Sequence, residues 1–196
     1  EQVIRLPASY QPNDSRRAVA EDAGDRARWG LPGQGVVFCS FNNNYKITPE
    51  VYASWIRILH RVPGSVLWLY IEHEAARARL LAEATRAGVA AERLVFARRA
   101  PHAEHLTRYA LADLFLDTFP CNAHTTASDA LWMGLPVLTR RGRSFASRVA
   151  GSLLQAVGLP ELVTDTPEAY EDLAVALAQD PDRLARLRTG LLERRS

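Results

Sequence analysis

The sequence has few cysteines and no long apolar run, and each scarcity argues against a class of protein. Its longest apolar stretch, SVLWLYI at residues 65–71, is about a third of the ~20 residues that cross a bilayer, so we expect no membrane span. The two cysteines, Cys39 and Cys121, lie in apolar surroundings, which predicts buried thiols rather than a disulfide or a metal pair. We therefore expect a reducing compartment, the cytoplasm.

Concentrated charge of one sign is also missing. The formal net charge is +2, and the arginines are scattered among acidic residues, so we expect no nucleic-acid partner and only a small anionic ligand. The chain opens with Glu1 and lacks both the basic and the apolar region of a targeting peptide, so we expect no targeting segment. It also lacks an initiator Met, which suggests an excised piece.

Three sequence motifs with known chemistry are absent as well. Neither GxGxxG nor GxxxxGK[S/T] occurs, which disfavours ordinary dinucleotide and P-loop sites. No cysteine and histidine spacing suits zinc, so we expect no metal site.

Short apolar segments are what the sequence does contain. With 47% hydrophobic and 23% charged residues, the chain fits one folded domain. Six segments are continuously apolar and rich in β-branched or aromatic residues, which is typical of strands buried on both faces. These predicted strands are residues 36–41, 65–71, 93–98, 114–119, 136–140 and 161–165.

Helical patterns separate the predicted strands. Thr48 is a good N-cap and Pro49 suits the first helical position, so a helix is predicted from there. Further helices are predicted at residues 74–89, 103–111, 126–134, 147–158 and 167–179. Strand and helix in alternation, with short connections, predict a doubly wound α/β fold: a mainly parallel, Rossmann-like sheet with helices on both faces.

The residues after each strand are the place to look for a ligand, because such sheets bind ligands beyond the carboxyl ends of their strands. One of these segments, PCNAHTT, places His124, Thr125 and Thr126 at the start of a predicted helix. Unpaired N–H groups and the helix dipole favour an anion there, and the two hydroxyls add donors. This chemistry suits a diphosphate, although Thr125 as a plain helix cap and His124 as a bystander stay open.

Two charged residues extend this hypothesis. Lys46, in the polar segment FNNNYK after the first strand, is placed to reach a phosphate at the same edge. Asp129, one turn into the helix, is suited to accept hydrogen bonds from sugar hydroxyls. A solvated surface lysine and a helix-surface acid are the alternative interpretations.

Three separated blocks carry a family resemblance. They are FCSFNNNYKITPEVYASWIRILHRVPGSVLWL, APHAEHLTRYALADLFLDTFPCNAHTTASDALWMGLPVLT and GRSFASRVAGSLLQAVGLPELV. In this order they resemble the C-terminal catalytic half of the O-linked N-acetylglucosamine transferase family, which includes SPINDLY-type O-fucosyltransferases. The resemblance implies one half of a two-domain GT-B glycosyltransferase. Residues 31–196 are then the nucleotide-sugar-binding domain, and residues 1–30 a linker and helix leading in from a missing N-terminal catalytic half.

The resemblance implies roles for the residues singled out above. Lys46 matches the lysine that binds the donor diphosphate and stabilises the leaving group without a metal ion, which makes it the expected catalytic residue. His124, Thr125 and Thr126 match the diphosphate-binding cluster, and Asp129 matches the residue that holds the ribose hydroxyls.

Further donor-binding residues come from the resemblance alone. His105 matches the histidine that stacks on the base, and Ala100 and Arg108 match positions at the base edge. Asn43 stands where animal enzymes have glutamine near the diphosphate and sugar, which makes its equivalence weaker. His102 replaces a lysine beside the ribose, which leaves a contact there open.

The leading prediction is the donor-binding half of a protein O-glycosyltransferase that moves N-acetylglucosamine from UDP-GlcNAc to Ser/Thr hydroxyls with no metal or other cofactor. Its expected partners are a protein acceptor, the N-terminal catalytic half and an upstream tetratricopeptide region, the last two absent from this chain. Because the family's candidate bases lie in the other half, the chain alone is expected to be inactive. The alternatives are a GDP-fucose donor, a nucleotide-binding interaction domain without transfer, and a receiver-like phosphoacceptor at Asp117, which the lack of an acidic pair disfavours.

Overall fold

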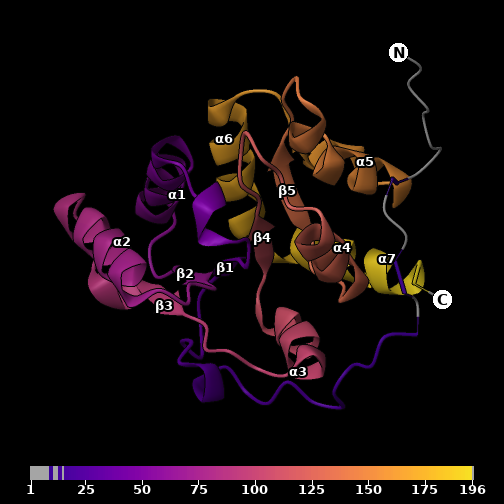
Figure 1. The fold of residues 1–196 in the computed structure, drawn as a ribbon, viewed down its shortest axis with the longest axis horizontal. Helices are drawn as coiled ribbons and strands as arrows, with labels where there is room; N and C mark the ends of the chain where they lie inside the picture. Colours follow the sequence, from indigo (N-terminus) through magenta and orange to yellow (C-terminus); the bar gives the residue numbers. More distant parts are fainter. Residues whose placement is uncertain (1–8, 11–12, 15, 196) are drawn as a thin grey trace.

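The computed structural model describes residues 9–10, 13–14 and 16–195. Six parallel strands form one sheet in the order β3-β2-β1-β4-β5-β6 (Figure 1). The strands are β1 Val37–Ser40, β2 Val66–Leu69, β3 Leu94–Phe96, β4 Leu114–Leu116, β5 Val137–Arg140 and β6 Val163–Thr164. Each lies within one of the six predicted segments, and the strand order is that of a doubly wound fold. The predicted fold class is confirmed.

The helices cover both faces of the sheet. The connections from β1 towards β3 and from β4 towards β6 run in opposite directions, so right-handed crossovers place their helices on opposite faces. Helix α6 returns to pack against α1 and over β4 and β5, while α4 packs against α5. The helices are α1 Pro49–Arg61, α2 Glu74–Arg86, α3 His102–Thr107, α4 Thr125–Trp132, α5 Val149–Ala156, α6 Pro167–Ala178 and α7 Pro181–Glu193.

Three of these helices begin with the same local chemistry. The side chains of Thr48, Thr166 and Asp180 accept hydrogen bonds from backbone N–H groups in the first turns of α1, α6 and α7, and a proline follows each cap. This signal predicted the start of α1, whereas α7 was not predicted, although DPD at residues 180–182 repeats the pattern of TPE at residues 48–50.

The core is aromatic and continuous across the sheet. Trp55 of α1, Trp68 of β2 and Phe115 of β4 are fully buried. Cys39 in β1 is also fully buried, whereas Cys121 is only partly buried, and both are free thiols. In the part of the chain that the structure describes, no helix is long and apolar enough to span a bilayer.

An irregular stretch, residues 13–14 and 16–30, precedes the first strand and is called here the N-terminal segment. Figure 1 shows its indigo trace running past α4 and α3 towards β3. Its described helical part is one 3-10 turn, Ala27–Trp29, and the Trp29 ring is buried in the same core as the sheet. Arg26 donates to Gly35 O and forms an ion pair with Asp113, which fixes the segment below the start of β1.

Candidate functional site

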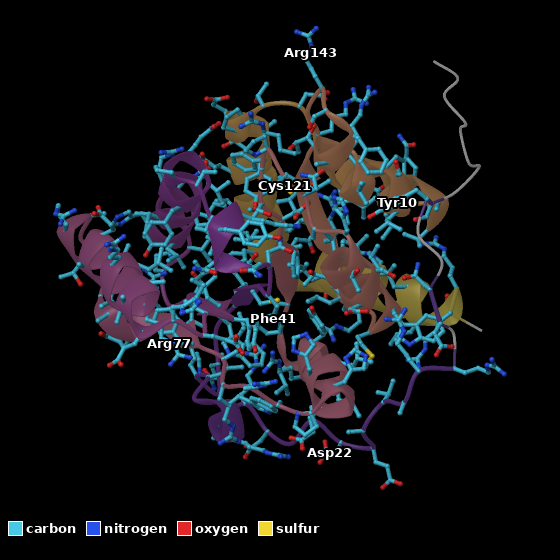
Figure 2. All side chains as sticks on the ribbon, viewed as in Figure 1. Tyr10, Asp22, Phe41, Arg77, Cys121 and Arg143 are labelled. Carbon is cyan, nitrogen blue, oxygen red and sulfur yellow. The ribbon has the colours of Figure 1, made fainter. Side chains whose placement is uncertain are left out.

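The strand order reverses between β1 and β4, and two polar loops meet at that point. Such a switch point is where doubly wound sheets bind ligands. The loop after β1 carries Lys46, and the loop after β4 leads into α4. Figure 2 labels Phe41 and Cys121, one from each of these loops.

Lys46 ends a short 3-10 helix, Asn44–Lys46, and its side chain crosses to the neighbouring loop. Its Nζ donates to the Asn122 carbonyl oxygen at 2.8 Å. The pKa of His124 is lowered, mainly by burial and then by the positive charge of Lys46. The structure therefore brings Lys46 and the start of α4 together, as the sequence predicted. None of the ion pairs found among the described residues involves Lys46, so its charge is not neutralised by a carboxylate there.

Helix α4 begins without a side-chain cap. The cap position is His124, whose side chain makes no capping hydrogen bond, and Thr125 and Thr126 are the first two helical residues. Thr125 is thus not the N-cap that the alternative interpretation assumed. The His124 Nδ1 lies 2.7 Å from the Tyr10 hydroxyl, and the Phe145 ring lies edge-on to the imidazole.

The buried side chain of Asp117 supports the loop between β4 and α4 through hydrogen bonds to its backbone. Its Oδ1 accepts hydrogen bonds from the backbone N–H groups of Thr118 and Ala123, both at 2.7 Å, and from Asn42. Its Oδ2 accepts from the Thr139 hydroxyl at 2.6 Å. Burial raises the pKa of Asp117 to about 6, against the opposing effect of these hydrogen bonds. A fully buried carboxylate with both oxygens engaged is not placed to accept a phosphoryl group, so the receiver-like alternative is wrong.

Two buried asparagines complete this support. Asn42 donates to Thr118 Oγ1 as well as to Asp117, which ties the loop after β1 to the loop after β4. Asn122 donates to Thr118 O and Arg140 O, so its own carbonyl is held where Lys46 meets it. Nothing in the sequence pattern distinguished Asn42 and Asn122 from ordinary loop residues.

His105 and Arg108 form a second polar group one strand away. His105 is half-buried against the rings of Phe41 and Tyr109, and burial together with the charge of Arg108 lowers its pKa to about 3. Arg108 donates from Nη2 to the His105 Nδ1, so the neutral imidazole carries its proton on Nε2.

Arg108 itself is fully buried, and its guanidinium carbon lies 4.5 Å from the centroid of the Phe41 ring. Its Nη1 donates to the Arg98 carbonyl oxygen at 2.8 Å. The guanidinium is therefore engaged within the protein, by His105, the Arg98 carbonyl and the Phe41 ring. Its contact with the edge of a base stays a prediction.

A cavity of about 370 Å³ lies between α4, α3 and the N-terminal segment. It is lined by Asp129 and Thr125, both predicted as donor-binding residues, and by His102, whose role the sequence left open. It also contains residues that sequence reasoning missed, because no local pattern connects them with α4: Asn13, Asp14, Arg17 and Ala18.

The remaining predicted residues lie at the margins of the two loops. Asn43 is exposed at the start of the Asn44–Lys46 turn, and Ala100 is half-buried in the loop between β3 and α3. Thr126 is half-buried in the first turn of α4.

The side chains at the switch point suit an anion more than a hard cation. Within the described residues, no group of three or more His, Cys, Asp or Glu side chains is placed to hold a metal ion. Lys46, the first turn of α4 and its hydroxyls instead supply N–H and O–H donors, which are the groups that bind phosphate oxygens.

Comparison with known proteins gives a consistent result. Residues 15–196 match the family model of glycosyl transferase family 41. The chain is 44% identical over 163 residues to a UDP-N-acetylglucosamine–peptide N-acetylglucosaminyltransferase from Caenorhabditis elegans, with 83% of this chain and 14% of the relative covered. It is 39% identical over 194 residues to a probable enzyme of the same name, SEC, from Arabidopsis thaliana, with 95% and 20% covered.

A solved structure, of an O-GlcNAc transferase mutant from Thermobaculum terrenum, superimposes with a TM-score of 0.80 at 36% identity. The match covers 97% of this chain and 36% of that one. The chain thus spans about a fifth or less of the two curated relatives named here. Its sheet has the architecture of one half of a two-domain glycosyltransferase of the GT-B type.

Proposed function

The chain belongs to glycosyl transferase family 41, and from that membership we propose that it is the donor-binding half of a protein O-glycosyltransferase. The donor is UDP-N-acetylglucosamine, and the acceptor is a serine or threonine hydroxyl of a protein. Both follow the names of the relatives that share 39–44% identity with it. The observation that supports the proposal most directly is the meeting of Lys46 with the uncapped start of α4 at the switch point of the sheet.

In the proposed reaction, the bond between the sugar and the diphosphate breaks as the acceptor hydroxyl attacks the anomeric carbon, and negative charge develops on the departing diphosphate. Lys46 and the first N–H groups of α4, with the Thr125 and Thr126 hydroxyls, stabilise that charge. These donors bind the phosphate oxygens directly, so the proposal needs no metal ion. Asp117, Asn42 and Asn122 hold the two loops in the arrangement that Lys46 requires.

The rest of the donor lies along the same edge of the sheet. Asp129 accepts hydrogen bonds from the ribose hydroxyls in the cavity that it lines. The base stacks on His105, and the loop containing Ala100 offers backbone groups to the edge of the base. Asn43 lies on the Lys46 side of the diphosphate.

Calorimetric titration of the chain with UDP and with GDP tests the proposal. We expect UDP to bind more tightly than GDP, with the same affinity in EDTA and in magnesium. Tighter GDP binding would instead favour the fucosyltransferase alternative, and a strong magnesium requirement would contradict metal-free binding of the diphosphate. Absence of binding by either nucleotide would overturn the proposal itself.

A second experiment tests the division of labour between the two halves of a GT-B enzyme. Aligning the acceptor and removing its proton contribute much of the rate, and these tasks are shared across the cleft between the halves. We expect no transfer of radiolabelled N-acetylglucosamine to an acceptor peptide by the chain alone, and transfer once an N-terminal catalytic half is supplied. Multiple turnovers by the chain alone would place the base within these residues.

A further inference from the structure

The N-terminal segment and Tyr10 contact the same part of α4 that the proposed function assigns to the donor. Arg17 forms an ion pair with Asp129, and the Ser128 hydroxyl donates to Asn13 Oδ1 at 2.7 Å. The Tyr10 hydroxyl lies 2.7 Å from the His124 Nδ1. Three contacts from a stretch of eight residues thus fall on α4 between its cap and its second turn.

Arg17 is held on several sides rather than solvated. Its side chain is 10% exposed, and its Nε donates to Asp14 O at 2.9 Å. Its guanidinium carbon lies 5.4 Å from the centroid of the Trp132 ring, a distance at which a cation is attracted to an aromatic face. A long side chain fixed in this way has already lost its rotamer freedom, so its position opposite Asp129 is maintained.

Arg17 favours the charged form of Asp129. Burial raises the pKa of the Asp129 carboxyl, and the charge and hydrogen bond of Arg17 act against that rise. The other titratable groups facing it are His102 of α3, which lowers the pKa slightly, and the Tyr109 hydroxyl, which is neutral at physiological pH. Asp14 lines the same cavity. Without Arg17, the pKa of this buried carboxyl would rise further.

We propose that Arg17 is a positioning residue for the nucleotide: it holds the Asp129 carboxylate fixed beside the cavity, so that the carboxylate accepts the ribose hydroxyls. Arg17 pairs with Asp129 Oδ1, and both side chains line the cavity of about 370 Å³ where the proposed ribose lies. The N-terminal segment then contributes to selection of a ribonucleotide, although it lies outside the sheet and its helices. This inference rests on the proposed function, because it needs a nucleoside diphosphate in that cavity.

Comparing UDP with 2′-deoxy-UDP isolates the ribose contact from the diphosphate contact. Because a hydrogen bond to a charged group corresponds to about 10- to 150-fold in Kd, we expect the chain to prefer UDP by such a factor. In Arg17→Met the preference should fall to a few-fold, because UDP loses more affinity than 2′-deoxy-UDP, which keeps only the 3′-hydroxyl. Arg17→Lys should restore part of it. Arg16→Met, one residue away and exposed, is the matched control and should keep the full preference.

The pH dependence adds a readout that a purely structural role would not change. Protonation of Asp129 removes the acceptor, so the preference for UDP is lost as pH falls through the pKa of this carboxyl. Arg17→Met should shift that loss to higher pH. In the background of Asp129→Asn, adding Arg17→Met should change UDP affinity less than twofold, because Arg17 acts through Asp129.

The outcomes separate this inference from the proposed function. Failure of the unaltered chain to bind UDP would count against the donor site as a whole. If the chain binds UDP and Arg17→Met keeps the full preference over 2′-deoxy-UDP, the positioning role is overturned. Tighter binding of both nucleotides by Arg17→Met would also overturn it, because the segment would then obstruct the cavity.

Discussion

Asp113 and Asp117 lie at the two ends of the same strand, β4, and their surroundings differ in kind. Asp113, at the amino edge of the sheet, accepts from Val37 N at 2.7 Å and pairs with Arg26, with 29% of its side chain exposed. Asp117, at the carboxyl edge, is fully buried and bonded only to neutral donors such as Thr139. At the amino edge a cation and an anion pair with each other. At the carboxyl edge Arg140 pairs with Glu50, but Lys46 has no carboxylate partner among the described ion pairs.

The same difference extends beyond β4. At the amino edge, Arg93 donates to the carbonyl oxygens of Leu59, Val62 and Ser65, so its hydrogen-bonding capacity is used within the fold. Arg188 of α7 likewise donates to Ala110 O and Ala112 O. At the carboxyl edge, the polar groups support two loops, one that carries Lys46 and one that leads into the start of α4, which has no side-chain cap. The comparison indicates that one edge serves stability, whereas the other is the edge that the proposed function assigns to binding.

The largest expected effect comes from Asp117→Ala. Its removal leaves two backbone N–H groups and the Thr139 hydroxyl buried without an acceptor, at about 1–3 kcal/mol for each unsatisfied group, and takes away one of the two acceptors of Asn42. We expect a loss of at least about 3 kcal/mol in unfolding free energy and of measurable UDP binding. Urea denaturation and calorimetry provide the two measurements.

The control for that substitution is Asp113→Ala, which should cost about 1–2 kcal/mol and leave UDP affinity unchanged, because Asp113 is partly solvated and remote from the site. Equal effects of the two substitutions on UDP binding would contradict the division between the edges.

The next prediction compares one cation from each edge of the sheet, Lys46 and Arg93. Lys46→Ala should weaken UDP binding about 10- to 150-fold, since a charged hydrogen bond to phosphate is lost, while the unfolding free energy changes by about 1 kcal/mol or less. Arg93→Ala should do the reverse and lower the unfolding free energy by about 1–3 kcal/mol, with no change in UDP affinity. Calorimetry and thermal melts on the same preparations check both, and unaltered UDP affinity in Lys46→Ala would remove that lysine from the site.

The carboxyl edge should also carry a characteristic pH dependence of stability. The pKa of Asp117 is raised from 3.8 to about 6, so its favourable contribution is present below about pH 4 and is lost as pH rises through about 6. The pKa of His105 is lowered from 6.5 to about 3, so its contribution is present above about pH 6.5 and is lost as pH falls. The two contributions therefore slope in opposite directions between about pH 4 and pH 6.

Single substitutions separate these opposing slopes. Asp117→Asn should leave stability rising with pH over that window, and His105→Gln should leave it falling, with each contribution changing by about 2–3 kcal/mol across the window. Urea denaturation at several pH values measures both slopes. The same slope in both variants would show that neither group titrates as its burial implies.

The smallest effect concerns helix starts. Thr166 caps α6 through Ala169 N, so Thr166→Ala should cost about 1 kcal/mol of stability and leave nucleotide binding intact. Thr126→Ala in the first turn of α4, where the cap is His124, should instead weaken UDP binding with a smaller change in stability. Thermal melts and calorimetry distinguish the pair, and a stability loss confined to Thr126→Ala would reverse the expectation.

Local sequence patterns were sufficient for most of the fold. Strands buried on both faces have continuously apolar sequences, and a Thr-Pro pair marks the start of a helix. All six strands and the beginning of α1 could therefore be predicted. Helix α7 carried the same signal in Asp180 and Pro181 and was overlooked.

The site was predictable only where its residues follow a strand or open a helix. Lys46 and His124 meet because the parallel topology brings the two strand ends together, and that topology could be inferred. Arg17 could not, because its pairing with Asp129 joins residues 112 positions apart through an irregular segment with no periodic signal. The burial of Arg108 was missed for a different reason: an arginine among aromatic rings is exceptional, and the sequence does not show which rings surround it.

The attachment of Arg26 at the amino edge gives Arg17 a property that a dissolved cation lacks. Eight residues of chain lie between the two arginines, so Arg17 stays tethered near Asp129 even when their ion pair is broken. Short tethers of this kind give effective concentrations on the order of millimolar. Whenever the pair opens, it re-forms within the chain itself, at a rate that does not depend on protein concentration. Free arginine added to Arg17→Met would have to reach comparable millimolar levels before it occupied the same place.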